Sequence, residues 1–307
     1  MKTLVIVPGL KYYYFNDIDS PDIVVKEEKY LSDCNLFSRC VQILSKKTNL
    51  ARIYEYCISD WKEDIRRSDR CIIFDQAFSV ALVKSLHDIN SKLKIYIYCW
   101  NPVFKDKQIL RKFKKVSSII STYSFDKNDC KKYGFHFAPM VYKMDYQVAD
   151  NTNNDFDVIF VGYLKNRGNI LKTFYNYLEK NGFNQFFYVI DNVKNEDPVP
   201  FDLKTAYMDY KDYKLLLSKS KAVLDITQEG QVGLTIRTLE TLCYHKKLIT
   251  NNADIVNYDF YDSNNIFVIE KDDMNNLKDF LSTPFKPIEG KILKKYNFSD
   301  WIDNFNE

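Results

Sequence analysis

The sequence predicts an α/β protein with two Rossmann-like parallel-sheet domains that face a central cleft. Short apolar runs of strand type alternate with stretches of helical periodicity along the chain. Several of these runs, such as CIIFD and KIYIYCW, are apolar on both faces. Such strands are typical of parallel sheets that helices cover on both sides. With 307 residues, the chain is long enough for two such domains.

The N-terminal domain is expected at 1–148. Its predicted strands cover 4–7, 71–75, 94–100 and 118–122, and its predicted helices cover 32–47, 76–89 and 107–116. The polar stretch KMDYQVADNTNNDFD then has little periodicity, which is typical of a linker between domains.

The C-terminal domain is expected at 156–307, where the alternation restarts. Its predicted strands are 157–162, 186–190, 222–226, 247–250 and 265–269, and its predicted helices are 170–182, 210–220 and 234–245. Near the end of the chain, Ser299 is expected to cap a terminal helix that can cross back to the first domain. Trp301 and Phe305 share one face of that helix.

Composition limits the classes of function. No apolar run approaches the ~20 residues of a membrane span. The seven cysteines include no CxxC pair, which favours reduced thiols in the cytoplasm. Neither cysteines nor histidines show metal-ligand spacing, so we predict no metal and no cofactor. Residues 1–150 carry 25 basic against 18 acidic residues, and the remainder carries 19 against 23. The basic half fits a phosphate-bearing or membrane-surface partner, and the excess is too small to indicate nucleic acid.

Ligands of parallel sheets bind beyond the carboxyl ends of the strands, so the loops there are candidate sites. The first loop of the second domain reads VGYLKNRGN. Gly162 permits close approach of a ligand to the backbone, and Lys165 and Arg167 can meet phosphate. The loop lacks the GxGxxG spacing of dinucleotide-binding sites. A plain turn with solvated cations is the alternative.

The most informative segment is LDITQEGQVGLTIRTLETLCYHKKLIT. Its loop contains Gly230 and Gly233 and precedes a helix that begins near Thr235, which predicts an anion site at the helix N-terminus. Arg237, in the first turn, can bind a diphosphate through a bidentate guanidinium. Glu240 lies on the same helix face and can accept ribose hydroxyls. An ion pair between Arg237 and Glu240 within the helix is the alternative.

This segment resembles the donor domain of GT-B glycosyltransferases, especially bacterial enzymes of surface-polysaccharide and lipopolysaccharide synthesis. Those enzymes show a strand, a glycine loop, a segment like GLTIRTLETL and a strand like KKLIT. The resemblance covers roughly 156–305, and the N-terminal half only in architecture. It implies a nucleotide-sugar substrate such as a UDP-sugar, held by two groups of residues. The diphosphate would contact Gly233, Leu234, Thr235 and Arg237, and the ribose would contact Glu240, with Thr250 and Asn251 bordering the same pocket.

The stereochemical class stays open. Retaining members of this family often carry two glutamates separated by seven residues, and Val232 stands where the first would lie. The nearest candidate, Glu229, is eleven residues before Glu240. The resemblance therefore does not decide between retention and inversion.

Acceptor-side candidates follow from position alone. Gly9 follows the first strand, and Asp75 and Asn101 each follow a buried strand. An inverting transferase needs a general base beside the acceptor hydroxyl, and Asp75 is our candidate. The alternative is that Asp75 caps a helix that starts at Gln76.

The segment 105–115, KDKQILRKFKK, has six basic residues and one acidic residue. It predicts a basic amphipathic helix, which can lie on an anionic membrane surface and bring the enzyme to a lipid-linked acceptor. A core-facing helix with a solvated basic side is the alternative.

Together these patterns predict a metal-independent, hexosyltransferase-like enzyme of the cytoplasm, peripheral on the inner face of the cell membrane, that transfers a sugar to a glycan or lipid-linked acceptor. Two other functions stay open. One is a non-catalytic two-lobed protein that binds a sugar or nucleotide. The other is a CDP-polyol phosphotransferase, which would need a histidine base.

Overall fold

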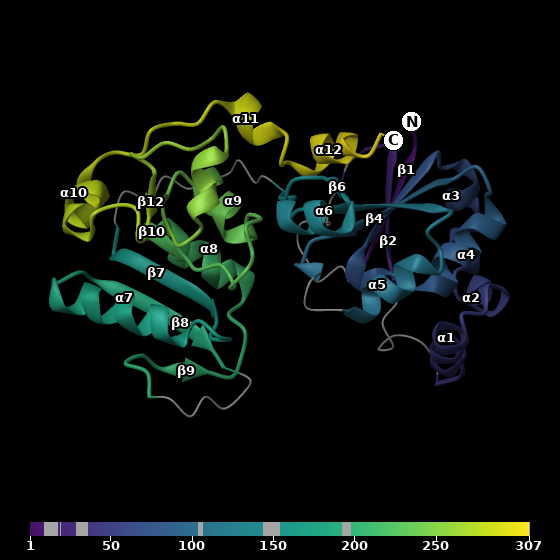
Figure 1. Ribbon diagram of the computed structural model, residues 1–307, viewed down its shortest axis with the longest axis horizontal. Helices are drawn as coiled ribbons and strands as arrows, with labels where there is room; N and C mark the ends of the chain where they lie inside the picture. Colours follow the sequence, from purple (N-terminus) through teal and green to yellow (C-terminus); the bar gives the residue numbers. More distant parts are fainter. Residues whose placement is uncertain are drawn as a thin grey trace. The chain divides into compact units, whose positions relative to one another are not determined.

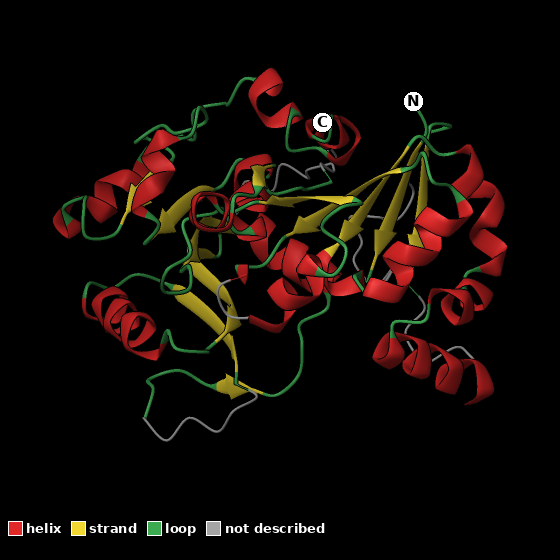
Figure 2. Ribbon diagram, turned by 45° about the vertical axis from the view of Figure 1, so that its right-hand side comes forward, coloured by secondary structure: helices red, strands yellow, loops and turns green. Residues whose placement is uncertain are grey.

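The computed structural model describes residues 1–8, 18, 20–28, 36–103, 107–143, 154–191 and 198–306. The chain forms two compact units, one of Met1–Met140 with Trp301–Glu307 and the other of Val141–Asp300. Each unit contains one six-stranded sheet, which Figure 1 and Figure 2 show with helices packed against it. All strand pairs are parallel. The predicted fold class, α/β with two Rossmann-like sheets, is confirmed.

The first sheet has the strand order β2-β1-β3-β4-β5-β6. Its strands are β1 Thr3–Val7, β2 Ile23–Glu27, β3 Arg70–Phe74, β4 Lys94–Cys99, β5 Ile120–Ser124 and β6 His136–Phe137. The helices of this unit are α1 Leu36–Thr48, α2 Ala51–Cys57, α3 Lys62–Arg67, α4 Val80–Ile89, α5 Lys107–Lys114 and α6 Lys127–Tyr133, with short 3-10 helices η2 Ser59–Trp61 and η3 Asp75–Ala77.

The two faces of the first sheet are covered differently. Alternate strand residues such as Cys71 and Ile73 join a core with apolar residues of α2, α3, α4 and α5. The intervening residues, such as Phe74, contact the C-terminal segment, which comprises α12 Phe298–Trp301 and the 3-10 helix η7 Ile302–Asn304. The last residues of the chain therefore complete the core of the unit that the first residues begin.

Trp301 and Phe305 are fully buried against this face. The ring of Trp301 lies 4.7 Å from that of Tyr98, and its indole Nε1 donates to the Pro139 carbonyl at 2.7 Å. The prediction that Ser299 caps the terminal helix is wrong, because the helix begins one residue earlier and Ser299 lies inside it.

A buried arginine ties the C-terminal segment to the strands. Arg70, in β3, is only 2% exposed. Its Nε donates to Thr3 Oγ1 at 2.8 Å, and its Nη1 donates to the Phe305 carbonyl at 2.9 Å and to Asn306 Oδ1 at 3.2 Å. These bonds satisfy a charge that would be costly to bury alone.

The second sheet has the order β12-β11-β10-β7-β8-β9. Its strands are β7 Phe156–Tyr163, β8 Gln185–Ile190, β9 Leu203–Lys204, β10 Ser220–Asp225, β11 Lys247–Thr250 and β12 Ile266–Val268. The helices are α7 Gly168–Lys180, α8 Tyr210–Ser218, α9 Ile236–Cys243, α10 Leu277–Ser282 and α11 Gly290–Lys294, with 3-10 helices η5 Ala253–Asn257 and η6 Met274–Asn276.

Alternation along β7 divides the core of this unit into two clusters. Val158 and Phe160 pack with α7 and α10, whereas Ile159 and Val161 pack with α8 and the end of α9. Figure 1 shows α7 alongside β7 and β8. Helix α7 ends just before Gly182, whose φ of 73° suits a glycine after a helix end.

The sequence missed several elements. Strands β2, β6 and β9, together with helices α2, α3, α6, α10 and α11, had no predicted counterpart. Among the described residues, no helix is long and apolar enough to cross a membrane.

We expect Trp301→Ala to lower the free energy of unfolding of the first unit by about 3–5 kcal/mol, because it empties a buried aromatic site. Urea denaturation, with hydrogen exchange of the β3 and β4 amides, measures the loss. Tyr56→Ala is the control, since Tyr56 is 65% exposed in the same unit, and it should change stability by less than about 0.5 kcal/mol. Equal stability of both variants would contradict a structural role for the C-terminal segment.

Candidate functional site

The two predicted donor loops start from neighbouring strands. Strands β7 and β10 lie side by side in the second sheet, and the chain runs from β7 toward one edge and from β10 toward the other. The boundary between them is the topological switch point, where ligands of open parallel sheets bind. The loop 164–167 follows β7, and the loop 226–235 follows β10. The two loops, which were predicted as separate parts of a donor site, therefore begin side by side at the switch point.

Arg167 joins the two strand ends. Its Nη1 donates to the Ile226 carbonyl at 2.5 Å, and its Nη2 donates to the Tyr163 carbonyl. The guanidinium carbon lies 5.6 Å from the centre of the Phe160 ring. Burial lowers the pKa of Arg167, and the nearby Asp225 opposes this shift. In this structure, therefore, Arg167 holds the backbone of both loops, and its predicted contact with phosphate stays a prediction.

Gly162 lies close to the Phe160 ring and to Arg167. A Cβ at this position would lie 3.3 Å from the Phe160 ring and 3.5 Å from Arg167 Nη2. A side chain would therefore need a small shift of the Phe160 ring, and it would be in ordinary contact with the guanidinium that joins the strands.

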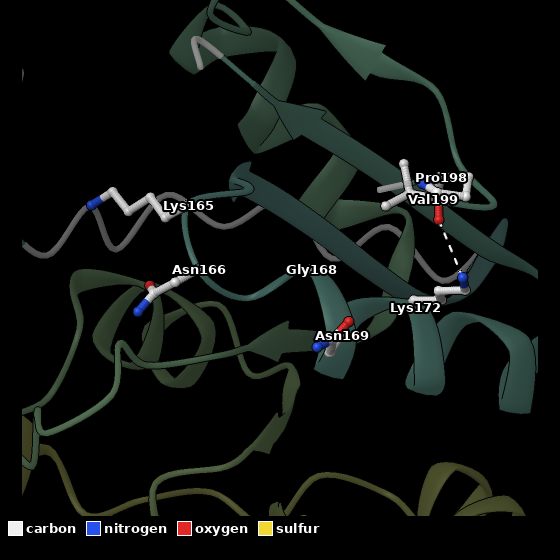
Figure 3. A pocket seen from close by; sticks show the side chains of 7 residues that line it. All are labelled: Lys165, Asn166, Gly168, Asn169, Lys172, Pro198 and Val199. Carbon is white, nitrogen blue, oxygen red and sulfur yellow. Dashed lines mark hydrogen bonds between the residues drawn. The ribbon is translucent and has the colours of Figure 1, made fainter. Parts of the chain in front are cut away.

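The rest of the first loop lines a pocket of ≈ 320 Å³ at the N-terminal end of α7. Figure 3 shows Lys165, Asn166 and Asn169 at this pocket, with Lys172 donating to the Pro198 carbonyl at 3.2 Å. The side chain of Lys165 extends away from Lys172. The loop therefore presents Lys165 to this pocket, whereas Arg167 contacts β10.

The N-terminus of α9 is fixed by a buried carboxylate. Thr235 is the N-cap residue, and its Oγ1 accepts from the Thr238 amide at 3.3 Å. The hydroxyls of Thr235 and Thr238 both donate to Asp225 Oδ2, at 2.5 and 2.9 Å. Burial raises the pKa of Asp225, although these two hydrogen bonds favour its charged form. The end of β10 thereby sets the position of the helix N-terminus. The predicted start of the helix near Thr235 is confirmed.

The glycine loop turns sharply before α9. Gly230 has a φ of 81°, a conformation that suits glycine. Gln231 closes the turn, since its amide donates to the Gln228 carbonyl and its Nε2 donates to the Gly233 carbonyl at 3.1 Å. Gly233 and Leu234 are buried, so they support the loop from within.

Residues after β11 hold the same loop. Asn251 Oδ1 accepts from both the amide and the hydroxyl of Thr227, at 2.8 and 3.1 Å. The next residue, Asn252, donates from Nδ2 to the Val232 carbonyl at 3.2 Å, and its own amide donates to the buried Thr250 Oγ1. The predicted residues Thr250 and Asn251 thus belong to the framework of the loop.

Arg237 and Glu240 form the intrahelical pair that was the alternative interpretation. Arg237 Nη1 lies 2.6 Å from Glu240 Oε2. The guanidinium also stacks on Tyr213 of α8, with its carbon 3.8 Å from the ring centre, a favourable cation–π geometry. The Arg237 side chain is 27% exposed, whereas that of Glu240 is 1% exposed. The structure therefore presents an oriented guanidinium to solvent and covers the carboxylate.

Tyr142 lies near Glu240 and contacts Tyr210. Tyr142 is fully buried, and its hydroxyl lies 3.4 Å from that of Tyr210. Burial, and then the negative charge of Glu240, raise the pKa of Tyr142. Because the Glu240 side chain is covered in this structure, its contact with a ribose stays a prediction.

In the first unit, Asp75 lies at the carboxyl end of β3. The switch point of that sheet lies between β1 and β3, so Asp75 occupies the corresponding position. Its Oδ1 accepts from the Gln76 amide at 2.8 Å. The α-helix that was predicted from Gln76 begins at Val80, where Ser79 caps it, and Asp75 instead begins the short 3-10 helix η3. Asn101 is exposed after β4, and Gly9 lies outside the described residues.

Asp225, Tyr213 and Asn252 are among the residues of the candidate site that the sequence did not predict. Asp225 lies at the carboxyl end of a buried strand. Asp75 was selected because it follows such a strand, and the same criterion would have selected Asp225. Tyr213 and Asn252 gave no local signal, because their contacts come from other elements. Within the described part of the chain, no three His, Cys, Asp or Glu residues gather as metal ligands.

The raised pKa of Asp225 predicts a pH dependence. A carboxyl group whose pKa is higher in the folded than in the unfolded state holds its proton longer when folded, so stability falls as pH rises between the two values. Asp225→Asn removes this titration and keeps an oxygen for both threonine hydroxyls. We expect the unfolding free energy of the native protein, relative to Asp225→Asn, to fall as pH rises through that window and then to level off. Urea titrations across the acid range measure this difference, and a rise with pH would contradict it.

Comparison with solved structures finds the same fold among glycosyltransferases. TarM matches with a TM-score of 0.54 at 13% identity, over 83% of this chain and 58% of TarM. A UDP-forming α,α-trehalose-phosphate synthase from Burkholderia xenovorans matches with 0.53 at 12% identity, over 83% and 76% of the two chains. A glycosyltransferase from Rickettsia africae ESF-5 matches with 0.51 at 12%, over 99% and 86%.

The chain thus spans less than two thirds of the length of TarM. No family model matches the sequence, and no curated protein matches it. At these identities the similarity establishes the fold alone, which is the two-sheet fold that the GT-B resemblance predicted.

Proposed function

We propose that this chain is a glycosyltransferase that transfers a sugar from a nucleotide-diphosphate-sugar to a hydroxyl of a glycan or lipid-linked acceptor. One observation carries the proposal. At the switch point of the second sheet, the N-terminus of α9 presents Arg237, and Glu240 lies one turn further along the helix. A helix N-terminus and a guanidinium complement a diphosphate, and a carboxylate complements the hydroxyls of a ribose.

Arg237 is the principal diphosphate ligand in this proposal. Tyr213 stacks on the guanidinium, and Glu240 holds it in the free protein. The positive end of α9 adds to its field. As the bond to the sugar breaks, negative charge grows on the diphosphate leaving group, and the guanidinium and the helix N-terminus stabilise it.

Binding exchanges one partner of Arg237 for another. The guanidinium swings from Glu240 to the diphosphate, and the uncovered carboxylate accepts the ribose hydroxyls. Gly233, Leu234 and Thr235 shape the backbone around the diphosphate, and Gly162, Arg167, Gly230, Thr250 and Asn251 form the surrounding donor site.

The names of the structural neighbours support the choice of donor. One neighbour is a UDP-forming synthase, and a TarM variant from S. aureus was solved with fondaparinux, α-GlcNAc-glycerol and UDP. We therefore propose a UDP-sugar as the first donor to test. The reaction would be metal-independent, since Arg237 and α9 supply the positive charge that a metal would otherwise bring.

The acceptor side is proposed for the N-terminal domain, within 1–148. Asp75 would act as the general base if the reaction inverts, with Gly9 and Asn101 beside the acceptor. The basic helix α5 would contact the inner face of the cell membrane, from the cytoplasm, where lipid-linked intermediates of surface polysaccharide or lipopolysaccharide are built.

Arg237→Ala should weaken UDP binding by about 10- to 100-fold, since hydrogen bonds to charged groups are worth about 1.5–3 kcal/mol. Calorimetry with UDP and with inorganic pyrophosphate separates the two proposed contacts. Arg237→Ala should weaken both ligands, whereas Glu240→Gln should weaken UDP alone. Arg237→Lys, which keeps a cation beside Glu240, should give an intermediate loss.

Lys278→Ala is the matched control, because Lys278 is an exposed cation of α10 in the same unit. Thermal shifts with UDP-, GDP-, CDP- and dTDP-sugars first identify the base, since a ligand at 100 times its Kd stabilises by about 2.7 kcal/mol. UDP affinity that is equal in Arg237→Ala and Lys278→Ala would refute the site. Binding of a nucleotide-sugar without any turnover would favour the non-catalytic binding protein.

Asp75→Asn should lower kcat by about 10²- to 10⁴-fold, the usual contribution of a general base. Asparagine can still accept the Gln76 amide, so the local turn is kept. Release of nucleoside diphosphate from the donor measures kcat, and UDP affinity should be unchanged. Asp88→Asn, at an exposed residue of α4, is the control. An unchanged kcat in Asp75→Asn would exclude Asp75 as the base.

A further inference from the structure

An apolar pocket of ≈ 390 Å³ lies in the first unit, away from the strand ends that the proposed function uses. Its walls come from α5 and the turn after it, from β5, and from the end of α6 with the residues that follow. Leu110, Phe113, Ile120, Tyr133 and Phe135 make these walls apolar. The volume falls within the range of about 300–1,000 Å³ that is typical of small-molecule sites.

The walls are aromatic and packed. The Phe135 ring lies 6.1 Å from that of Phe113 and 5.6 Å from that of Tyr133. Phe113 is buried and packs on Phe78 at 4.9 Å, which anchors this side of the pocket in the core of the unit. Tyr133 and Phe135 are half-buried, so the pocket is open to solvent while its floor is part of the folded core.

The rim of the pocket is positively charged. Lys114 lines it, and Arg111, one turn earlier, lies on the same side of α5. Lys132 Nζ lies 5.3 Å from the centre of the Tyr133 ring. All three cations are exposed, and none forms a salt bridge with a described residue. An apolar hollow beside such a rim complements an amphiphile with an anionic head.

We propose that this pocket receives an acyl chain of an anionic phospholipid from the membrane surface, while Lys114, Arg111 and Lys132 hold the phosphate of the lipid. A soluble anion would not need the apolar walls, and a neutral apolar ligand would not need the cations. The inference rests on the proposed membrane contact of α5, but not on the transferase reaction. It adds that the contact is a defined lipid site as well as a charged surface.

The experiment is flotation of the full chain with vesicles of phosphatidylcholine, with and without phosphatidylglycerol. Three variants and one control test the apolar walls and the charged rim separately. Thr122→Phe fills the pocket from β5, and Ser117→Phe fills it from its exposed rim if the first variant folds poorly. Lys114→Glu reverses a rim charge, and Lys278→Glu makes the same change on the other unit. Melting temperatures and UDP affinity are measured in parallel.

We expect binding to the anionic vesicles only, weakened by salt. Lys114→Glu should reduce partitioning by about 30-fold, since each charge near an anionic surface contributes about 1 kcal/mol and the reversal changes two charges, and Lys278→Glu should have no effect. The filling variants should lose binding while they keep their melting temperature, although they add apolar surface. Equal binding by folded filling variants and the native chain would overturn the lipid site. Equal binding to neutral and anionic vesicles, or no binding to either kind, would also overturn the lipid site. UDP affinity should be unchanged throughout, so a failure of the proposed function is seen separately.

Discussion

The candidate site depends on one bridging side chain. Arg167 donates to backbone carbonyls at the ends of β7 and β10, the two strands that flank the switch point of the second sheet. It fixes where both loops begin, and Gly162 lies close to it. From the same strand end, Asp225 holds the threonines that start α9. The position of the helix N-terminus, and hence of Arg237, is therefore set by buried polar contacts beneath the site, and such contacts are strong where water is excluded.

Buried polar contacts also hold the first unit together. Arg70 is buried in β3, and its hydrogen bonds reach residues at the very end of the chain. Trp301 and Phe305 cover the face of the sheet opposite the core that α2, α3, α4 and α5 form. A parallel sheet needs both faces covered. The C-terminal residues from Trp301 on therefore belong to the core of the unit that carries Asp75, although Trp301 follows Asp75 by 226 positions in the sequence.

The fold was predictable because buried parallel strands are apolar on both faces, as in β3, β4, β7 and β10. The strands that the sequence missed, β2, β6 and β9, lie at sheet edges, and they are short or carry charges such as Lys26 and Lys204. Within the site, the glycine loop and the capped start of α9 were predictable from local chemistry. The stacking of Arg237 on Tyr213 was not, because α8 supplies the ring from a distant part of the sequence. Arg167 was expected to meet phosphate, and no local pattern indicated that it joins two strands.

The central claim is that a nucleoside diphosphate binds at the N-terminus of α9 by taking Arg237 from Glu240. A crystal structure of the full chain with UDP tests it most directly. The account predicts the diphosphate within hydrogen-bond distance of Arg237, the Arg237–Glu240 pair opened, and the ribose hydroxyls on Glu240. UDP bound elsewhere, for example in the pocket at the start of α7, with the pair intact, would contradict the account.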